Sequence, residues 1–205
     1  MGWEADLLLY IQNNIRSDLL NPFMTLLTHT GDYGVLVIVL AVVLVLIPRT
    51  RRIGVIAGIS LAIEALLTNL LIKNIVARTR PYDEINGLVN LIERQKDFSF
   101  PSGHTGSAFA VMGAILFIAI LGLPIAAKNG DLSRSKMSTA YKIVAVLAII
   151  YAAALAFSRL YVGVHYPTDV LGGIILGLAT SIIAYFIYRF VIRKLAQRKA
   201  NKKLP

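Results

Sequence analysis

Long apolar segments are the feature that most constrains the fold of this chain. A helix needs about 20 mostly apolar residues to cross a bilayer, and four segments reach or approach that length, at residues 53–72, 107–127, 141–157 and 170–192. The chain is 57% hydrophobic and has a mean hydropathy of +0.69, which excludes an ordinary soluble domain. The sequence therefore predicts an all-α, polytopic membrane helix bundle.

Two less regular segments decide the number of crossings. Val35 to Ile47 is apolar but short, so we expect one span from Phe23 to Ile47 with a polar, bent outer end. Residues 1–20 are predicted to form an interfacial N-terminal helix, because apolar residues recur at helical spacing at Leu8, Ile11, Ile15 and Leu19. A sixth crossing by this segment stays open. The expectation is one membrane domain over residues 1–205 with five to six transmembrane helices.

Basic residues indicate the orientation, because they collect in cytoplasmic loops. With five spans, three basic sets fall on one side together with a single acid, Asp131: Arg49, Arg51 and Arg52; Lys128, Arg134, Lys136 and Lys142; and Arg189, Arg193, Lys194, Arg198, Lys199, Lys202 and Lys203. That side is predicted to be cytoplasmic, with residues 193–205 as a basic tail against anionic lipid. The net charge of +10 is thereby explained by membrane lipids as partners, without nucleic acid.

The two loops predicted on the outer side hold the polar residues that need an explanation, since polar groups near a bilayer are costly. The first group, at the outer end of the second span, contains Lys73, Arg78 and Arg80. Lys73 and Arg80 are seven residues apart, about two helical turns, so both can face one way before Pro81 stops the helix. Arg78 is interpreted as a flanking residue that snorkels to the interface.

The second group is Pro101-Ser102-Gly103-His104, directly before the third span at residues 107–127. Ser102 can cap the helix through its hydroxyl, Gly103 allows a ligand to approach the backbone, and the free N–H groups of a helix start favour an anion. A capped helix with an idle histidine is the alternative for this tetrapeptide alone.

The third group runs from Ser158 to Asp169. Arg159 ends a span, His165 follows six residues later, and Asp169 lies four residues beyond His165. Pro167 is suited to open the next helix. Across that helix start the carboxylate can hold one ring nitrogen of His165, which leaves the other nitrogen as a base.

Together these residues fit phosphoryl transfer. Lys73, Arg80 and Arg159 would bind phosphate oxygens, and Ser102 and the Gly103 amide would add hydrogen bonds. His165 would attack phosphorus with Asp169 orienting it, and His104 would protonate the leaving alkoxide. These loops contain no carboxylate cluster suited to magnesium, and the chain has no cysteine for thiolate chemistry. No metal and no cofactor are expected.

The three groups resemble the three-part signature of the type 2 phosphatidic acid phosphatase family: Lys73-x6-Arg80-Pro81, Pro101-Ser102-Gly103-His104, and Ser158-Arg159-x5-His165-x3-Asp169. The resemblance covers residues 73–169. It implies a six-helix core and a metal-independent phosphatase that works through a phosphohistidine intermediate. It also implies the roles given above for the eight signature residues.

Among compact bacterial members of that family, the resemblance favours those that convert phosphatidylglycerophosphate to phosphatidylglycerol, at the outer face of the plasma membrane. An undecaprenyl pyrophosphate phosphatase is the alternative, and a non-catalytic lipid-phosphate binder or transporter is the second alternative.

Two polar residues match no motif. Glu64 is expected to be hydrogen-bonded inside the bundle, near Thr68 or Asn69, and His29 to be bonded to a neighbour at the outer end of the first span.

Overall fold

Four helices of the computed structural model are long and apolar enough to cross a membrane, and they coincide with the four apolar segments of the sequence. The structure describes residues 2–126 and 132–201. The first of these helices is α4 (Arg51–Leu66), which continues through a π-helical segment, η3 (Leu67–Ile72), into α5 (Lys73–Val76). The others are α7 (Gly103–Leu121), α8 (Thr139–Tyr161) and α9 (Pro167–Asn201). The prediction of a helical membrane bundle is confirmed.

A broken helix forms the fifth candidate span, as predicted for residues 23–47. It consists of α2 (Leu20–His29), a 3-10 turn over Asp32–Gly34 (η2) and α3 (Val35–Leu46), and its two arms are bent by 45°. The bend has a local cause, because Tyr33 and Gly34 have positive φ values of 53° and 66°. This left-handed conformation cannot continue a helix.

The N-terminal segment consists of α1 (Gly2–Tyr10) and a π-helical turn over Ile11–Ile15 (η1). It supplies the sixth helix of the expected core but is not among the described helices long enough to span. Leu8 is buried against Tyr166 and Ile11 against Tyr82, as their spacing predicted, but the helix ends at Ile15 and leaves Leu19 84% exposed. The chain becomes extended at Arg16, so the predicted apolar stripe does not reach Leu19.

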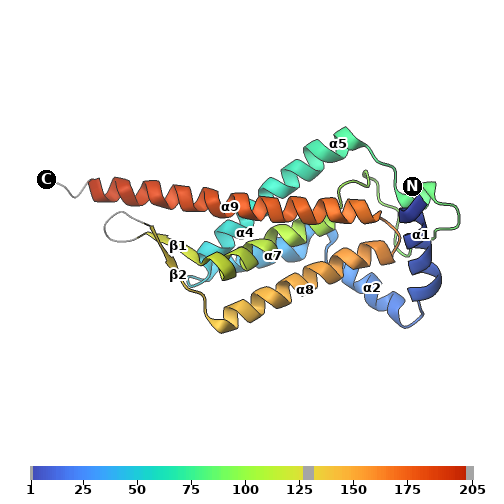
Figure 1. Ribbon diagram of the computed structural model, residues 1–205, viewed down its shortest axis with the longest axis horizontal. Helices are drawn as coiled ribbons and strands as arrows, with labels where there is room; N and C mark the ends of the chain where they lie inside the picture. Colours follow the sequence, from blue (N-terminus) through green and yellow to red (C-terminus); the bar gives the residue numbers. More distant parts are fainter. Residues whose placement is uncertain (1, 127–131, 202–205) are drawn as a thin grey trace.

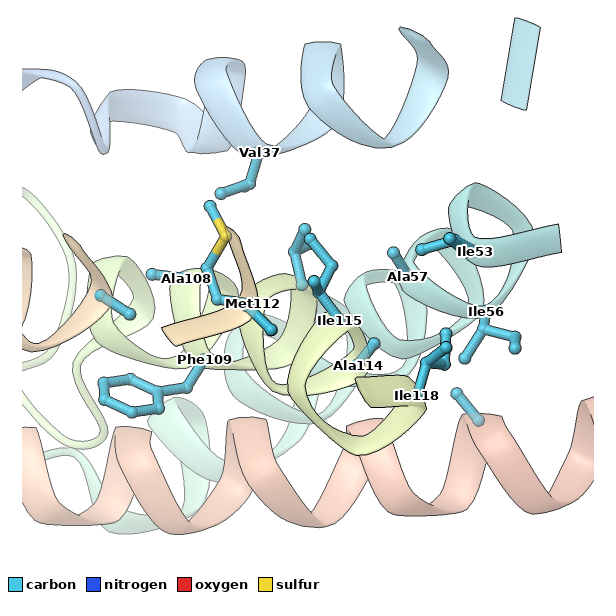
Figure 2. Close-up of a cluster of buried hydrophobic side chains, with 14 of the residues drawn as sticks. Val37, Ile53, Ile56, Ala57, Ala108, Phe109, Met112, Ala114, Ile115 and Ile118 are labelled. Atoms are coloured by element: carbon cyan, nitrogen blue, oxygen red, sulfur yellow. The ribbon is translucent and has the colours of Figure 1, made fainter. Parts of the chain in front are cut away.

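Helix α7 lies at the centre of the bundle and is the most buried of the candidate spans. Its side chains pack against α3 and α4, and Val37 of α3 lies beside Met112 of α7 (Figure 2). Helix α9 approaches α7 closely because two of its residues lack a side chain. A Cβ atom at Gly173 would lie 2.7 Å from the Ser102 carbonyl oxygen, and one at Gly177 would lie 2.5 Å from the Gly106 carbonyl oxygen.

One element was not predicted. Strands β1 (Leu123–Ala126) and β2 (Leu132–Ser135) form a short antiparallel hairpin between α7 and α8, with Leu123 opposite Ser135. The basic residues Lys128, Lys202 and Lys203, and the acid Asp131, lie outside the described residues.

Different structural elements lie at the two ends of the bundle. The hairpin and the C-terminal end of α9 lie at one end, whereas α1, α2 and the end of α5 lie at the other (Figure 1). The short helix α6 (Pro81–Glu84) belongs to the second end, where Ile85 and Leu88 pack against Leu8 of α1. The bundle therefore presents loops and short helices at the end where the polar motifs occur.

Close contact between α7 and α9 leads to a stability prediction. Gly177→Ala would drive a methyl group into the backbone of α7, so we expect a loss of about 1–3 kcal/mol, as for other overpacked positions. Gly58→Ala is the matched control, since no atom lies within 4 Å of a Cβ built there. It should be neutral or stabilising, because alanine favours helix over glycine. Thermal unfolding in detergent measures both, and equal melting temperatures would contradict the packing argument.

Candidate active site

The backbone of the first motif, from Lys73 to Pro81, has a different conformation from the one predicted. Helix α5 ends at Val76, and Ala77 takes a left-handed conformation with φ 46°. Arg80 therefore lies on extended chain, and Pro81 is the first residue of α6 rather than the residue that stops a helix. The prediction that Lys73 and Arg80 share a face two turns apart was wrong in its geometry. The two side chains nevertheless converge, because the chain folds back after Ala77.

Lys73 and Arg80 converge on Asp97, which the sequence reasoning did not identify. Lys73 Nζ contacts Asp97 Oδ2, and Arg80 Nη2 donates to Asp97 Oδ1 at 2.6 Å. Arg80 also donates from Nε to the Asp97 carbonyl oxygen at 3.0 Å and from Nη1 to the Val164 carbonyl oxygen at 2.9 Å. Both cations are buried, whereas the Asp97 side chain is half exposed. A carboxylate thus lies where two cations converge, at the edge of solvent.

The pKa of Asp97 reflects this pairing. Partial burial alone would raise the pKa, but hydrogen bonds and charges from Lys73 and Arg80 outweigh it and lower the pKa to about 2. Asp97 is therefore an anion throughout the physiological pH range. It occupies the kind of position that an anionic ligand of the two cations would take.

The second motif lies at the start of α7. Ser102 is the N-cap residue, as predicted, but its hydroxyl does not cap the helix and instead accepts a hydrogen bond from the Thr105 hydroxyl at 3.0 Å. The Ser102 amide donates to the Asp169 carbonyl oxygen at 3.0 Å, which joins the start of α7 to the start of α9. A Cβ atom at Gly103 would lie 3.8 Å from Lys73 Nζ, so the lysine ammonium group faces the first turn of α7.

His165 lies between α8 and α9 and is 1% exposed. Its Nε2 atom is 3.3 Å from Arg80 Nη1, and its Nδ1 atom is 3.5 Å from Asp169 Oδ2. Ser99, which the sequence reasoning missed, lies 3.4 Å from Nδ1 and donates to Asp169 Oδ2 at 2.5 Å. Nδ1 therefore faces a carboxylate and a hydroxyl, and Nε2 faces the cations.

The environment of His165 disfavours its charged form. Burial lowers the pKa of the imidazole well below its ordinary value, and the positive charges of Arg80, Arg159 and Lys73 lower the pKa further. The ring is accordingly neutral at pH 7. A neutral imidazole has the free lone pair that a nucleophile or base needs.

Arg78 does not snorkel, so that interpretation was wrong. Its Nη1 atom donates to Asp169 Oδ1 at 2.7 Å, and its Nη2 atom donates to Glu4 Oε2 at 2.7 Å. The guanidinium group also lies 3.7 Å from the centre of the Tyr166 ring. Arg78 thus holds the oxygen of Asp169 that does not face His165, and Glu4 of α1 holds Arg78. No local pattern indicates these contacts, because Arg78 is 74 residues from Glu4 and 91 residues from Asp169 along the chain.

Arg159 is the third cation and is 1% exposed. Its Nη1 atom donates to Thr28 Oγ1 at 2.6 Å, but its buried Nε–H has no hydrogen-bond partner among the residues that the structure describes. A buried donor without an acceptor is costly. Its charge acts on Arg80 and His165, so Arg159 belongs to the same cluster. An anion at this place would supply the missing acceptor.

The other polar residues singled out in the sequence, His104, His29 and Glu64, each have a hydrogen-bond partner. His104 Nε2 is 2.9 Å from Asp32 Oδ1, and His29 Nδ1 is 2.7 Å from Asp32 Oδ2. This confirms that His29 bonds to a neighbour. Thr68 Oγ1 donates to Glu64 Oε1 at 2.7 Å, so Glu64 is hydrogen-bonded inside the bundle as expected. Within residues 2–126 and 132–201, no three histidine, aspartate or glutamate side chains lie together as metal ligands.

Fold and site together define a multi-pass membrane protein with a cluster of three buried cations that lies beside two histidines. The PAP2 superfamily is the family whose sequence model matches, over residues 53–193. The chain therefore belongs to the PAP2 superfamily, and it is a lipid phosphate phosphatase of that family.

Relatives support this assignment. Undecaprenyl-diphosphatase of Sulfolobus acidocaldarius is 30% identical over 90% of this chain and 78% of its own length. Phosphatidylglycerophosphatase B of Bacillus subtilis is 32% identical over 80% of this chain and 73% of its own length. The crystal structure of a transmembrane PAP2-type phosphatidylglycerolphosphate phosphatase from Bacillus subtilis has a TM-score of 0.67 and is 28% identical, covering 93% of this chain and 85% of that one.

The lowered pKa of His165 can be tested directly. An imidazole with an ordinary pKa of 6.5 is about three-quarters protonated at pH 6, whereas His165 should stay neutral there. Nitrogen NMR of imidazole-labelled protein in detergent distinguishes the two forms, and the chain has only three histidines. His165→Asn assigns the resonance by its disappearance. A His165 signal typical of imidazolium at pH 6 would contradict the electrostatic argument.

Proposed function

We propose that this protein removes phosphate from a membrane lipid through a phosphohistidine intermediate on His165, without a metal. The observation that carries the proposal is the contact of His165 with Arg80 through Nε2 and with Asp169 through Nδ1. Nε2 is the nitrogen on the cation side, where a phosphate would bind. The substrate phosphate would replace or share Asp97 as the partner of Lys73 and Arg80, and would accept from the free Nε–H of Arg159.

In the first step, the Nε2 lone pair forms a bond to phosphorus as the bond from phosphorus to the alcohol oxygen breaks. His104 gives its proton to that oxygen, and the alcohol leaves. Asp169, held by Ser99 and Arg78, stabilises the positive ring of His165. In the second step, water attacks phosphorus and gives a proton to His104. Inorganic phosphate leaves, and the electrons of the N–P bond return to Nε2.

Three buried cations would offset the charge that develops on the phosphate oxygens. Preorganised donors of this kind contribute more in a site that excludes water than in solution. Ser102 and the Gly103 amide are proposed to complete the set at the start of α7. The eight signature residues would then act as one unit, within a single domain made of residues 1–205.

An apolar cavity supports a substrate with hydrocarbon tails. It has a volume of about 510 Å³ and lies between α3, α4, α7 and α8. Its lining is almost entirely apolar and includes Leu36, Leu40, Met112, Ala148 and Tyr151. Leu36 of the lining lies four residues after Asp32, and Tyr151 of the lining hydrogen-bonds Thr30 at 2.7 Å, so the cavity begins near the bend that carries Asp32. A lipid could place its phosphate among the cations and one tail in the cavity.

Phosphatidylglycerophosphate is proposed as the substrate, giving phosphatidylglycerol as the product. The relative named phosphatidylglycerophosphatase B and the Pro-Ser-Gly-His form of the second motif support this choice. Undecaprenyl pyrophosphate is the second candidate, supported by the relative named undecaprenyl-diphosphatase, which matches a larger share of the chain. The site has three cations, so it could accept either phosphate class.

The site is proposed to face the extracytoplasmic side of a bacterial plasma membrane, with the C-terminus in the cytoplasm. Basic residues support this orientation, because Arg51, Arg134 and Arg193 belong to segments at or beyond the end of the bundle opposite the site.

Phosphate release from detergent-solubilised lipid, measured in EDTA, tests the reaction. Wild type should turn over, and His165→Asn should lose at least about a thousandfold in kcat, since the covalent route is removed. When a reaction with phosphate-labelled substrate is quenched, wild-type protein should carry label that is acid-labile and base-stable, as expected of a phosphohistidine. The His165→Asn protein should carry none. Lys96→Gln, a control in the same outer segment, should keep wild-type activity. Equal turnover of His165→Asn and wild type would overturn the proposal.

The substrate is decided by comparing kcat/KM for phosphatidylglycerophosphate, undecaprenyl pyrophosphate and phosphatidic acid.

A second measurement tests the lipid-tail cavity. Ala148→Trp should fill it and raise KM for a long-chain lipid phosphate about tenfold, with little change for p-nitrophenyl phosphate, which has no tail. Ala153→Trp is the control, because Ala153 lies on the same helix but is exposed and does not line the cavity. If Ala148→Trp and Ala153→Trp behave alike on both substrates, the tail does not use this cavity.

A further inference from the structure

The second histidine of the site has a carboxylate partner outside the three motifs. Asp32 lies in the bend between α2 and α3, and its two oxygens contact two different imidazoles. Oδ1 is 2.9 Å from His104 Nε2, and Oδ2 is 2.7 Å from His29 Nδ1. His104 is largely buried, whereas the His29 and Asp32 side chains are 48% and 39% exposed. The three groups form a row from the site to the surface.

The backbone around Asp32 is shaped to the ring of His104. A Cβ atom at Gly31 would lie 2.6 Å from His104 Cδ2, so only glycine lets the bend approach the ring this closely. Tyr33, one residue after Asp32, has a φ of 53°, which is strained for a tyrosine. A strained backbone persists only where surrounding structure maintains it, and here it presents Asp32 to His104.

Charge around His104 makes the carboxylate important. The positive charges of Arg159 on α8 and Lys73 on α5 both act on the ring. His165, on the loop before α9, also lies within electrostatic range. Asp32 is the anion in direct contact with the ring, and it favours the protonated form. A general acid must hold a proton before the reaction, and an adjacent carboxylate is the partner that favours a protonated imidazole beside two cations.

We propose that Asp32 is a positioning residue for His104, and that His29 orients Asp32 from the solvent side. Asp32 accepts the Nε2–H of His104 and leaves Nδ1–H to face the reaction. This inference rests on the proposed function, in which His104 is the general acid. It adds a second histidine–carboxylate pair to the site. In this pair the histidine donates a proton, whereas in the pair of His165 and Asp169 the histidine is the nucleophile.

Proton movement follows from this arrangement. When the P–O bond of the substrate breaks, Nδ1–H transfers its proton to the alkoxide, and the neutral ring keeps its Nε2–H on Asp32. In the second step, Nδ1 accepts a proton from the attacking water as the O–P bond forms. The ring returns to its charged form, and Asp32 carries its negative charge throughout.

The leaving group of the substrate separates this role from a structural one. Asp32→Asn keeps the shape of the side chain and removes its charge. We expect it to lower kcat for dioctanoyl phosphatidic acid about 10- to 100-fold, which is part of the roughly 10²- to 10⁴-fold contribution of general acid catalysis. For p-nitrophenyl phosphate the loss should be under about threefold, because nitrophenolate leaves without a proton. The alkaline limb of kcat/KM should also move to lower pH, since the imidazolium loses its stabilising anion.

Three further variants complete the experiment. Asp32→Glu restores the charge and should recover most of the activity on phosphatidic acid. His29→Gln removes only the outer contact and should give a smaller loss confined to phosphatidic acid, a result available even if Asp32→Asn does not fold. Asp83→Asn is the matched control. Asp83 pairs with Arg94, and its side chain is 40% exposed, about the same exposed fraction as that of Asp32 (39%). Removing the charge of Asp83 should leave kcat for both substrates unchanged.

The outcomes are distinguishable. Equal losses on both substrates with an unchanged pH profile, or no loss in Asp32→Asn and His29→Gln, would overturn the role of Asp32 while wild-type turnover in EDTA still stood. If wild type shows no such turnover, or His165→Asn keeps it, the proposed function itself fails.

Discussion

Three buried cations at one end of a membrane bundle are the constraint on which the rest of the structure depends. Burying a charge costs several kcal/mol unless it is paired and hydrogen-bonded, and the charges of Lys73, Arg80 and Arg159 all act on His165. Asp97 offsets two of them. Arg159 has only the Thr28 hydroxyl and the fields of more distant acids, and its Nε–H is unpaired among the described residues. This unpaired donor beside two other buried cations is the observation on which the proposed phosphate site rests.

Helix starts bring the remaining groups to these cations. Helices α7 and α9 both begin at the site, and the hydrogen bond from the Ser102 amide to the Asp169 carbonyl oxygen joins them. Their close approach depends on Gly173 and Gly177, which leave room for the backbone of α7. The packing of two spans therefore decides the distance between the second and third motifs. Loops alone could not hold the imidazole of His165 against a guanidinium group in this way.

Much of this could be predicted from the sequence, and the failures share a cause. The four spans and the bent fifth follow from local hydropathy. Glu64 and His29 bond to residues four and three positions away, so local reasoning predicted that each has a near neighbour as its partner. Arg78 was misread because its partners, Glu4 and Asp169, are far along the chain. Asp97 and Ser99 carried no pattern of their own. Asp32 did carry a signal, since an acid between two glycines in an apolar span is costly, but its partner could not be named.

The sequence by itself determined that this chain is a helical membrane protein, which residues form its three motifs, and hence which chemistry they can perform. Periodic hydropathy and residue type are local properties, so they can be read without coordinates. Only the tertiary structure decided which carboxylate holds which distant cation or imidazole: Asp97 with Lys73 and Arg80, Asp169 with Arg78, and Asp32 with His104. Those pairings join separate helices and loops, and electrostatic contact depends on distance in space rather than on distance along the chain.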